Sequence, residues 1–198
     1  MSDSQIDKTQ RRKSQAFKQL VEWVAVVGIA LMVAMLLRIF LVQQYYIAGP
    51  SMETTMFSDN RVLVNKLAYR LGDIERGDVV VFDRALMNGS EVEHDDLIKR
   101  VIGLGGETIA IKDCVVLING MALPEPYLPK RDSTQSDLGE RCGVVEMIET
   151  TLAADEVFLM GDNRPQSFDS RMFGAINQDL IIGQAFALIW PLGSAKGL

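Results

Sequence analysis

A long apolar run near the N-terminus constrains this 198-residue chain more than any other feature. Residues 20–42 contain only two charged side chains, Glu22 and Arg38, which lie near the two ends of the run. About 20 apolar residues are enough to cross a bilayer as a helix. A buried core helix or a cleavable secretion signal would also be apolar, but the run is long for a signal, and a cut after Ala48 would place the large Tyr46 where a small residue is needed. We therefore predict an uncleaved transmembrane helix over residues 20–42.

The charges on either side of this run are unevenly distributed. The whole chain has a formal net charge of -6, which argues against nucleic acid as a partner. Residues 1–20, in contrast, carry five Lys or Arg and only two acidic side chains, whereas residues 43–60 carry no Lys or Arg. Basic flanks of a membrane helix stay on the cytoplasmic side. We expect a cytoplasmic basic tail over residues 1–19 and an extracytoplasmic domain over residues 43–198.

Short segments rich in β-branched residues follow the run and are separated by turn signals, as is typical of antiparallel sheets. The expected strands are 62–66, 78–83, 97–104, 107–111, 114–118, 144–148, 157–160 and 181–189. Asn119-Gly120 predicts a hairpin turn, and the three prolines within residues 124–129 exclude a central strand there. The prediction is a mainly β domain on one membrane helix, with an exposed excursion over residues 121–142.

Metal and nucleotide sites find little support in the sequence. The two cysteines, Cys114 and Cys142, together with the single His94, are too few for a structural zinc site. The glycines of residues 103–106 lack the Lys-Ser/Thr ending of a phosphate-binding loop. We expect no metal and no cofactor. The cysteines can form a disulfide if the domain lies outside the cytoplasm, or they can be two buried thiols, and the sequence leaves both possibilities open.

Ser51 is the candidate nucleophile. It follows Gly49 and Pro50 shortly after the apolar run ends. Pro50 fixes its own φ and biases Gly49 toward extended geometry, and Gly49 lets the backbone approach a bound chain closely. These residue types also build ordinary turns, so the assignment depends on finding a base within reach of the serine.

Three side chains compete for the role of base. His94 lies in an acidic, charge-rich segment, which predicts a solvated surface histidine in a loop. Lys99 and Arg100 both lie inside an expected strand, and we expect one of them to face solvent. Arginine cannot lose its proton at workable pH, whereas the pKa of lysine falls readily on burial. Lowering the pKa of Lys99 from about 10.4 to about 8 costs about 3 kcal/mol, which desolvation can supply. Lys99 is therefore the predicted base.

Residues 161–174 form the densest polar stretch of the chain, between two apolar strands. A solvated loop would explain this composition. If Asp169 and Arg171 are instead buried, they need each other as partners. Ser167 could then hydrogen-bond to a neutral lysine and orient it.

Taken together, these segments resemble the bacterial type I signal peptidases, which are membrane-bound proteases with a Ser–Lys dyad. The matching segments, in the order of that family, are residues 49–52, 76–82, 99–104 and 161–174. The resemblance covers residues 20 to about 190. It implies that Ser51 is the nucleophile and Lys99 the general base, that Ser167 orients Lys99, and that Asp169 and Arg171 pair to hold their loop.

The resemblance also implies a β-barrel-like fold with a variable excursion over residues 112–156. Met52, Met56 and Ile98 fall at positions that line the substrate groove of the family. Thr54 stands where the family usually has proline, which we expect to loosen the turn and to alter one wall of the groove. Gly49 stands where some members carry a serine whose hydroxyl donates to the oxyanion.

The missing hydroxyl at Gly49 leaves the Ser51 backbone N–H to carry more of the oxyanion role, and one such donor is worth about 10² to 10³ in rate. Gly105 and Glu107 replace a proline and an aspartate of the general-base segment, which we expect to be tolerated. None of these departures removes either member of the dyad.

The resemblance implies an enzyme that cleaves signal peptides from secretory precursors after small residues (Ala-x-Ala) at the outer face of the plasma membrane. The expected partners are precursor proteins and membrane lipid. A self-cleaving, repressor-type Ser–Lys protease is one alternative, which the anchor and the absence of a DNA-binding segment disfavour. A non-catalytic, membrane-anchored binding domain is another, which the presence of both Ser51 and Lys99 disfavours.

Overall fold

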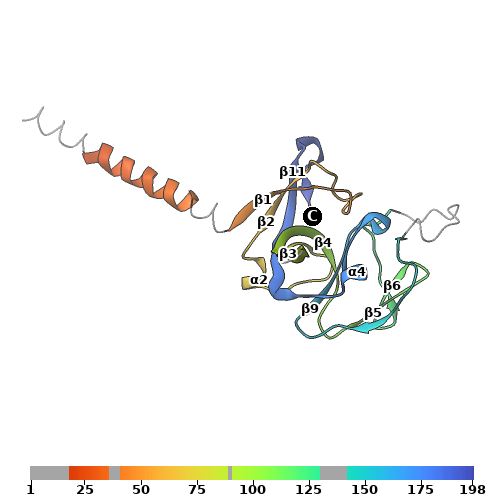
Figure 1. The fold of residues 1–198 in the computed structure, drawn as a ribbon. Coiled ribbons are helices and arrows are strands. Elements are labelled where there is room, and N and C mark those ends of the chain that lie inside the picture. Colours follow the sequence, from red (N-terminus) through yellow and green to blue (C-terminus); the bar gives the residue numbers. More distant parts are fainter. Residues whose placement is uncertain (1–17, 36–40, 89–90, 130–141) are drawn as a thin grey trace, which may run out of the picture. The chain divides into compact units, whose positions relative to one another are not determined.

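The computed structural model describes residues 18–35, 41–88, 91–129 and 142–198. The chain divides into two units, residues 1–42 and 43–198. In the first unit the helix Lys18–Met35 is long and apolar enough to cross a membrane (Figure 1). The predicted helical end at residue 42 is wrong, because Val42 already begins strand β1 (Val42–Tyr46); residues 36–40 lie outside the described part. A β-branched residue followed by polar Gln and Tyr suits the edge of a sheet better than a bilayer.

The second unit consists mainly of antiparallel strands, as predicted. After β1 the strands are β2 (Arg61–Asn65), β3 (Val79–Asn88), β4 (Glu91–Gly103), β5 (Thr108–Lys112), β6 (Val115–Ile118), β7 (Met121–Ala122), β8 (Met147–Thr151), β9 (Glu156–Met160), β10 (Ile176–Asn177), β11 (Ile181–Trp190) and β12 (Lys196–Gly197). The short helices are α2 (Ala68–Leu71), η1 (Arg164–Gln166), α4 (Ser170–Phe173), η2 (Gln178–Leu180) and η3 (Leu192–Ser194).

These strands form two sheets. The first runs β1-β2-β11-β3-β4-β9-β10, with β12 also paired to β11. The second runs β7-β6-β5-β8, and in Figure 1 β5 and β6 lie beyond β9, on the side away from β1 and β2. The chain leaves the first sheet at the end of β4, builds the second, and returns through β9, which pairs with β4.

Each of the eight predicted strands is present, with ends shifted by a few residues. The predicted hairpin is also present, since Asn119 and Gly120 both have positive φ and join Ile118 to Met121 across the turn. Residues 124–129 form no strand, as their prolines predicted. Residues 130–141 of the predicted excursion lie outside the described part. Pattern reasoning missed β1 and the two-residue strands β7, β10 and β12.

Two local expectations were settled by the structure. His94 is exposed as predicted, but it lies in β4 rather than in a loop, and its Nδ1 lies 2.8 Å from Asp83 Oδ2 on the paired strand β3. Cys114 and Cys142 form a disulfide, so they are not two free thiols. This bond closes the chain around residues 114–142.

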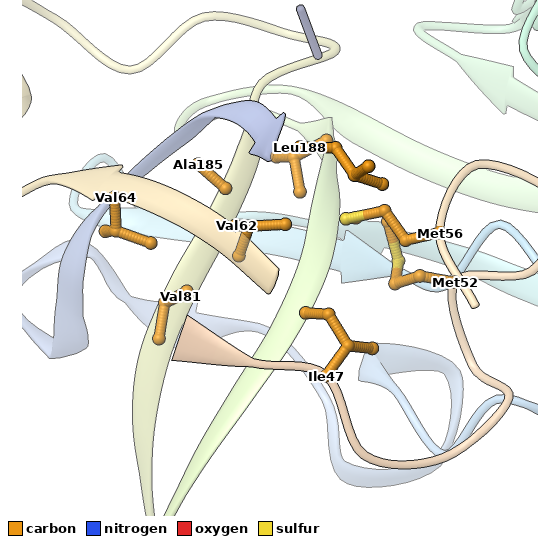
Figure 2. Close-up of a cluster of buried hydrophobic side chains, with 9 residues drawn as sticks. Ile47, Met52, Met56, Val62, Val64, Val81, Ala185 and Leu188 are labelled. Carbon is orange, nitrogen blue, oxygen red and sulfur yellow. The ribbon is translucent and has the colours of Figure 1, made fainter. Parts of the chain in front are cut away.

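Residues 79–82 of β3 are buried on both faces, which explains their unbroken apolar run. Val81 packs in one cluster with residues of β2 and β11 such as Val62 and Leu188 (Figure 2). Val80 and Phe82, which point the other way, pack in a second cluster. A strand buried on both faces makes a rigid support, and its antiparallel partner β4 carries the predicted general base.

Candidate active site

Ser51 and Lys99 lie side by side, although 48 residues separate them in the sequence. Ser51 is in the turn that follows β1, and Lys99 is in β4. The Lys99 ammonium donates to Ser51 Oγ at 2.8 Å and to the Ile98 carbonyl oxygen, also at 2.8 Å. The geometry therefore brings the predicted nucleophile within hydrogen-bond reach of the predicted base.

Burial alters the acidity of Lys99. Its side chain is only 3% exposed. Desolvation lowers the pKa of Lys99 from 10.5 to about 8, against the weaker opposing effect of the charges on Asp169 and Asp162. No carboxylate of the described residues forms an ion pair with Lys99. About a tenth of such lysines are neutral at pH 7, so a competent base is present at neutral pH.

The turn that carries Ser51 is closed by its own backbone. The Glu53 N–H donates to the Pro50 carbonyl at 3.0 Å, and the Met56 N–H donates to the Met52 carbonyl at 2.9 Å. Thr54, which replaces the usual proline of the family, is exposed between them. Backbone hydrogen bonds therefore close the turn around Thr54 without a proline at that position.

Gly49 adopts φ +88°, in the region that favours glycine, although a β-carbon there would meet open space. Glycine reaches this conformation without the steric cost that an L side chain carries. The Ser51 N–H donates to no described residue. It is therefore available as an oxyanion donor, and the conformation of Gly49 explains why glycine suits the position despite the missing hydroxyl.

The loop after β9, which begins at Gly161, packs against the turn that carries Ser51. The backbone N–H of Asn163 donates to the Ser51 carbonyl at 3.0 Å, and its side-chain amide donates to the Pro50 carbonyl at 3.1 Å. A β-carbon on Gly161 would collide with the Ser51 carbonyl oxygen and with Ser167 Oγ. The polar loop and the nucleophile turn thus leave no room for a β-carbon at position 161, and Asn163 ties them together through two hydrogen bonds.

Asp169 and Arg171 form the predicted pair, with Asp169 fully buried. Arg171 donates through Nε and Nη2 to the two carboxylate oxygens at 2.8 and 2.7 Å. Burial alone would raise the pKa of Asp169, but the hydrogen bonds and charge of Arg171 outweigh it and lower that pKa. Asp169 also accepts from the Gly161 N–H at 2.9 Å. The Asp169–Arg171 pair therefore holds Gly161, the residue that packs against the Ser51 carbonyl.

Ser167 is the predicted site residue whose expected contact is missing. Its Oγ is buried and makes no hydrogen bond of normal geometry among the described residues, although its hydroxyl lies close enough to the Asp169 carboxylate to help lower the pKa of that group. The predicted bond to Lys99 is therefore not formed in this structure, where Lys99 directs its hydrogen bonds to Ser51 and to a backbone carbonyl. Ser167 instead lies against Gly161.

Arg100 is a structural member of the site that sequence reasoning missed. Neither Lys99 nor Arg100 faces solvent, so the expectation that one of them does is wrong; Arg100 is 7% exposed. Its Nε and Nη2 donate to the two oxygens of Asp162 at 2.9 and 2.7 Å, and its Nη1 donates to the Gly77 carbonyl at 2.7 Å. No local signal points to this pair, because its members lie 62 residues apart.

A pocket opens beside the two reactive side chains. It is lined by Tyr45, Tyr46, Ile47, Ala48, Ser51, Val81, Asp96, Leu97, Ile98 and Lys99. Burial, followed by the neighbouring Asp96 carboxylate, raises the pKa of Tyr45 to about 12, so the phenol stays neutral. Among the described residues no group of three or more His, Cys, Asp or Glu side chains is arranged to hold a metal ion.

Of the three predicted substrate-binding residues, one lines the pocket and two are buried in the core. Ile98 lines the pocket beside Ser51 and Lys99. Met52 and Met56 do not line it, because both are fully buried in the apolar cluster that contains Val62 and Leu188 (Figure 2). Their methionine side chains fill the core beneath the nucleophile turn, where they support the turn instead of contacting solvent.

Comparisons with known proteins agree on one family. The family model described as "Signal peptidase, peptidase S26" matches residues 20–190. The chain is 38% identical to signal peptidase I P of Bacillus subtilis subsp. natto, over 94% of this chain and 95% of that protein. It is 34% identical to signal peptidase I T of Bacillus subtilis strain 168, over 96% and 94% of the two chains. A solved signal peptidase I from Enterococcus faecalis V583 is 30% identical, covers 57% of this chain and 97% of its own, and has a TM-score of 0.43.

Proposed function

We propose that this chain, which belongs to the signal peptidase family (peptidase S26), cleaves signal peptides from secretory precursors with Ser51 as nucleophile and Lys99 as general base. The observation that carries the assignment is the 2.8 Å contact between Ser51 Oγ and a buried Lys99 whose pKa is about 8. A lysine of ordinary pKa would hold its proton at neutral pH and could not accept another.

The reaction follows from this contact. Neutral Lys99 takes the proton of Ser51 Oγ as that oxygen attacks the carbonyl carbon of the last signal-peptide residue. The Ser51 N–H stabilises the oxyanion that develops. The intermediate collapses to an acyl-enzyme ester as Lys99 donates its proton to the departing amine. Lys99 then removes a proton from water as the water oxygen attacks the ester carbonyl, and it returns that proton to Ser51 Oγ as the ester bond breaks, which regenerates Ser51.

The pocket supports a preference for small residues at the cleavage site. Its lining includes Leu97 and Ile98, which precede Lys99 on β4, and Tyr45 on β1. Small side chains of the Ala-x-Ala type at the first and third positions before the cut would fit such a shallow site. Asp169, Arg171 and Ser167 act on the reaction indirectly, by supporting the loop on which the nucleophile turn rests.

The chain is membrane-anchored, as signal peptidase I proteins are, and its apolar helix supplies the anchor. We further infer that residues 1–19 are cytoplasmic and that residues 43–198 form the catalytic domain on the outer face of the plasma membrane, in contact with lipid. The excess of Lys and Arg before the helix supports this orientation. The disulfide between Cys114 and Cys142 supports it independently, because such bonds persist in oxidising compartments.

The assignment is tested with the full-length protein in detergent and a precursor that carries an Ala-x-Ala site. We expect Ser51→Ala to abolish cleavage while the variant keeps its circular dichroism spectrum and melting temperature. His94→Ala is the matched control and should cleave at the wild-type rate, because His94 is exposed and paired with Asp83. Substantial cleavage by folded Ser51→Ala, or loss of activity in folded His94→Ala, would contradict the proposed dyad.

A further inference from the structure

Among the described residues, three arginines with buried side chains near the site each contact the excursion over residues 112–156. Arg164 pairs with Glu125, Arg100 stacks on the ring of Tyr127, and Arg171 donates to the Cys142 carbonyl at 2.6 Å. We propose that Glu125 and Tyr127, the excursion clamp, are positioning residues that hold the nucleophile in its reactive place. This inference rests on the proposed function of Ser51.

The first arm of the excursion clamp is the Glu125–Arg164 pair. Arg164 Nη1 donates to Glu125 Oε2 at 3.1 Å, and Nη2 contacts the other carboxylate oxygen. The two side chains are 7% and 11% exposed, so a charge left alone here would be poorly solvated. The Tyr127 hydroxyl donates to Glu125 Oε1 at 2.8 Å and fixes the carboxylate. The arginine is thereby held in one orientation.

The orientation of Arg164 affects the nucleophile through one residue, Gly161. Arg164 Nε donates to the Gly161 carbonyl at 3.1 Å. Gly161 is the residue against which the Ser51 carbonyl is packed without room for a β-carbon. Movement of Arg164 therefore moves the surface that supports Ser51, and with it the alignment of Ser51 Oγ and Lys99.

The second arm acts on the next residue of the same loop. The centre of the Tyr127 ring lies 4.1 Å from the Arg100 guanidinium carbon. Arg100 in turn donates two hydrogen bonds to the carboxylate of Asp162. One short segment thus restrains two consecutive residues, Gly161 and Asp162, through two different arginines. The pocket lining comes from β1, β3, β4 and the nucleophile turn, so the excursion clamp is expected to affect the alignment of the reacting groups and not the binding of substrate.

The test measures kcat and KM of the full-length protein in detergent, with an Ala-x-Ala precursor, below the melting temperature of every variant. Glu125→Ala should lower kcat about tenfold to a hundredfold with little change in KM, because small misplacements of reacting groups have costs of that order. Added acetate, which can occupy the vacated carboxylate site, should restore part of the kcat of Glu125→Ala and leave the wild type unchanged.

The matched control is Glu107→Gln, which removes another carboxylate paired with an arginine, Arg76, away from the Ser51 loop. It should lower the melting temperature without lowering kcat. If Glu125→Ala does not fold, Glu125→Gln keeps the packing and removes only the charge, and its kcat should still fall. Wild-type kcat in a folded Glu125 variant, or an equal loss of kcat in Glu107→Gln, would overturn the proposal.

The failures of the two proposals are distinguishable by including Ser51→Ala. If Ser51→Ala still cleaves the precursor, the proposed nucleophile is wrong, and the proposal that the excursion clamp positions it fails as well. If Ser51→Ala is inactive while Glu125→Ala and Glu125→Gln both keep the wild-type kcat, the dyad stands and only the excursion clamp is refuted.

Discussion

Lys99 and Arg100 are neighbours on β4 and are almost equally buried, at 3% and 7% exposure. Successive residues of a strand point to opposite faces, so the two cations enter different surroundings. Arg100 meets the carboxylate of Asp162, a backbone carbonyl and the face of Tyr127. Lys99 meets a serine hydroxyl and a backbone carbonyl. The same strand therefore buries one cation with a counter-charge and one without.

The difference shows what makes a buried cation structural or reactive. A paired, hydrogen-bonded guanidinium keeps its charge and ties β4 to the loop that supports Ser51. An ammonium without a paired carboxylate is destabilised by desolvation, and its pKa falls. Burial is common to both residues, so the partner decides the outcome. Four measurements test this comparison.

The largest effect is expected from Lys99→Arg, which makes the two neighbours chemically alike. Arginine keeps the positive charge but cannot deprotonate at workable pH, so cleavage of the Ala-x-Ala precursor should fall by about 10³-fold or more. The rate is measured on protein whose folding is verified by its melting temperature. Activity within tenfold of the wild type would mean that residue 99 is not the base.

Removing the counter-charge of Arg100 should produce the next largest effect. Asp162→Ala leaves a buried guanidinium unpaired, and we expect a loss of about 3–5 kcal/mol in the free energy of unfolding. Denaturant unfolding measures this loss. The double variant Arg100→Met/Asp162→Leu removes both charges and should recover most of the stability. An Asp162→Ala protein as stable as the wild type would show that the pair contributes nothing to holding the fold.

Lys99→Met should have the opposite effect on stability. The pKa of Lys99 falls from 10.5 to about 8 on folding, so the folded wild type carries a penalty of about 3 kcal/mol below pH 8. Between pH 8 and 10.5 the unfolded chain binds more protons, and the wild type gains stability as pH rises. The variant should therefore be more stable at pH 7, and its advantage should vanish above pH 10.5.

Thermal or denaturant unfolding of both proteins across this pH range measures the difference, and titration of other groups cancels in it. Lys99→Met should be inactive throughout. A variant less stable than the wild type at pH 7 would contradict the claim that Lys99 is buried at a cost.

The smallest effect concerns the pH dependence of the wild type. Only neutral Lys99 is competent, so kcat/KM should rise about tenfold between pH 7 and pH 9 and level off above the pKa of about 8. A profile that is flat from pH 6 to 9, or one that falls as pH rises through 8, would exclude Lys99 as the group whose deprotonation activates the enzyme.

Sequence reasoning reached the residues of the proposed site because they occur in short, recognisable segments. Ser51 follows Gly-Pro, Lys99 lies in an apolar strand, and Asp169 and Arg171 are two residues apart. The same reasoning misplaced Met52 and Met56, which the family resemblance put in the groove and the structure puts in the core. Turn residues have no period that tells an inward from an outward side chain, so the packing of the turn alone could decide.

By itself, the sequence determined the apolar helix, the β class of the domain and the two residues of the proposed dyad, because each depends on local composition, local periodicity or a short motif. Only the tertiary structure decided which buried cation has a partner. Arg100 finds Asp162 across 62 residues and Arg164 finds Glu125 across 39, and no local pattern encodes such distances. The pKa of Lys99 likewise depends on desolvation by segments far apart in the chain, which exists only once they have packed together.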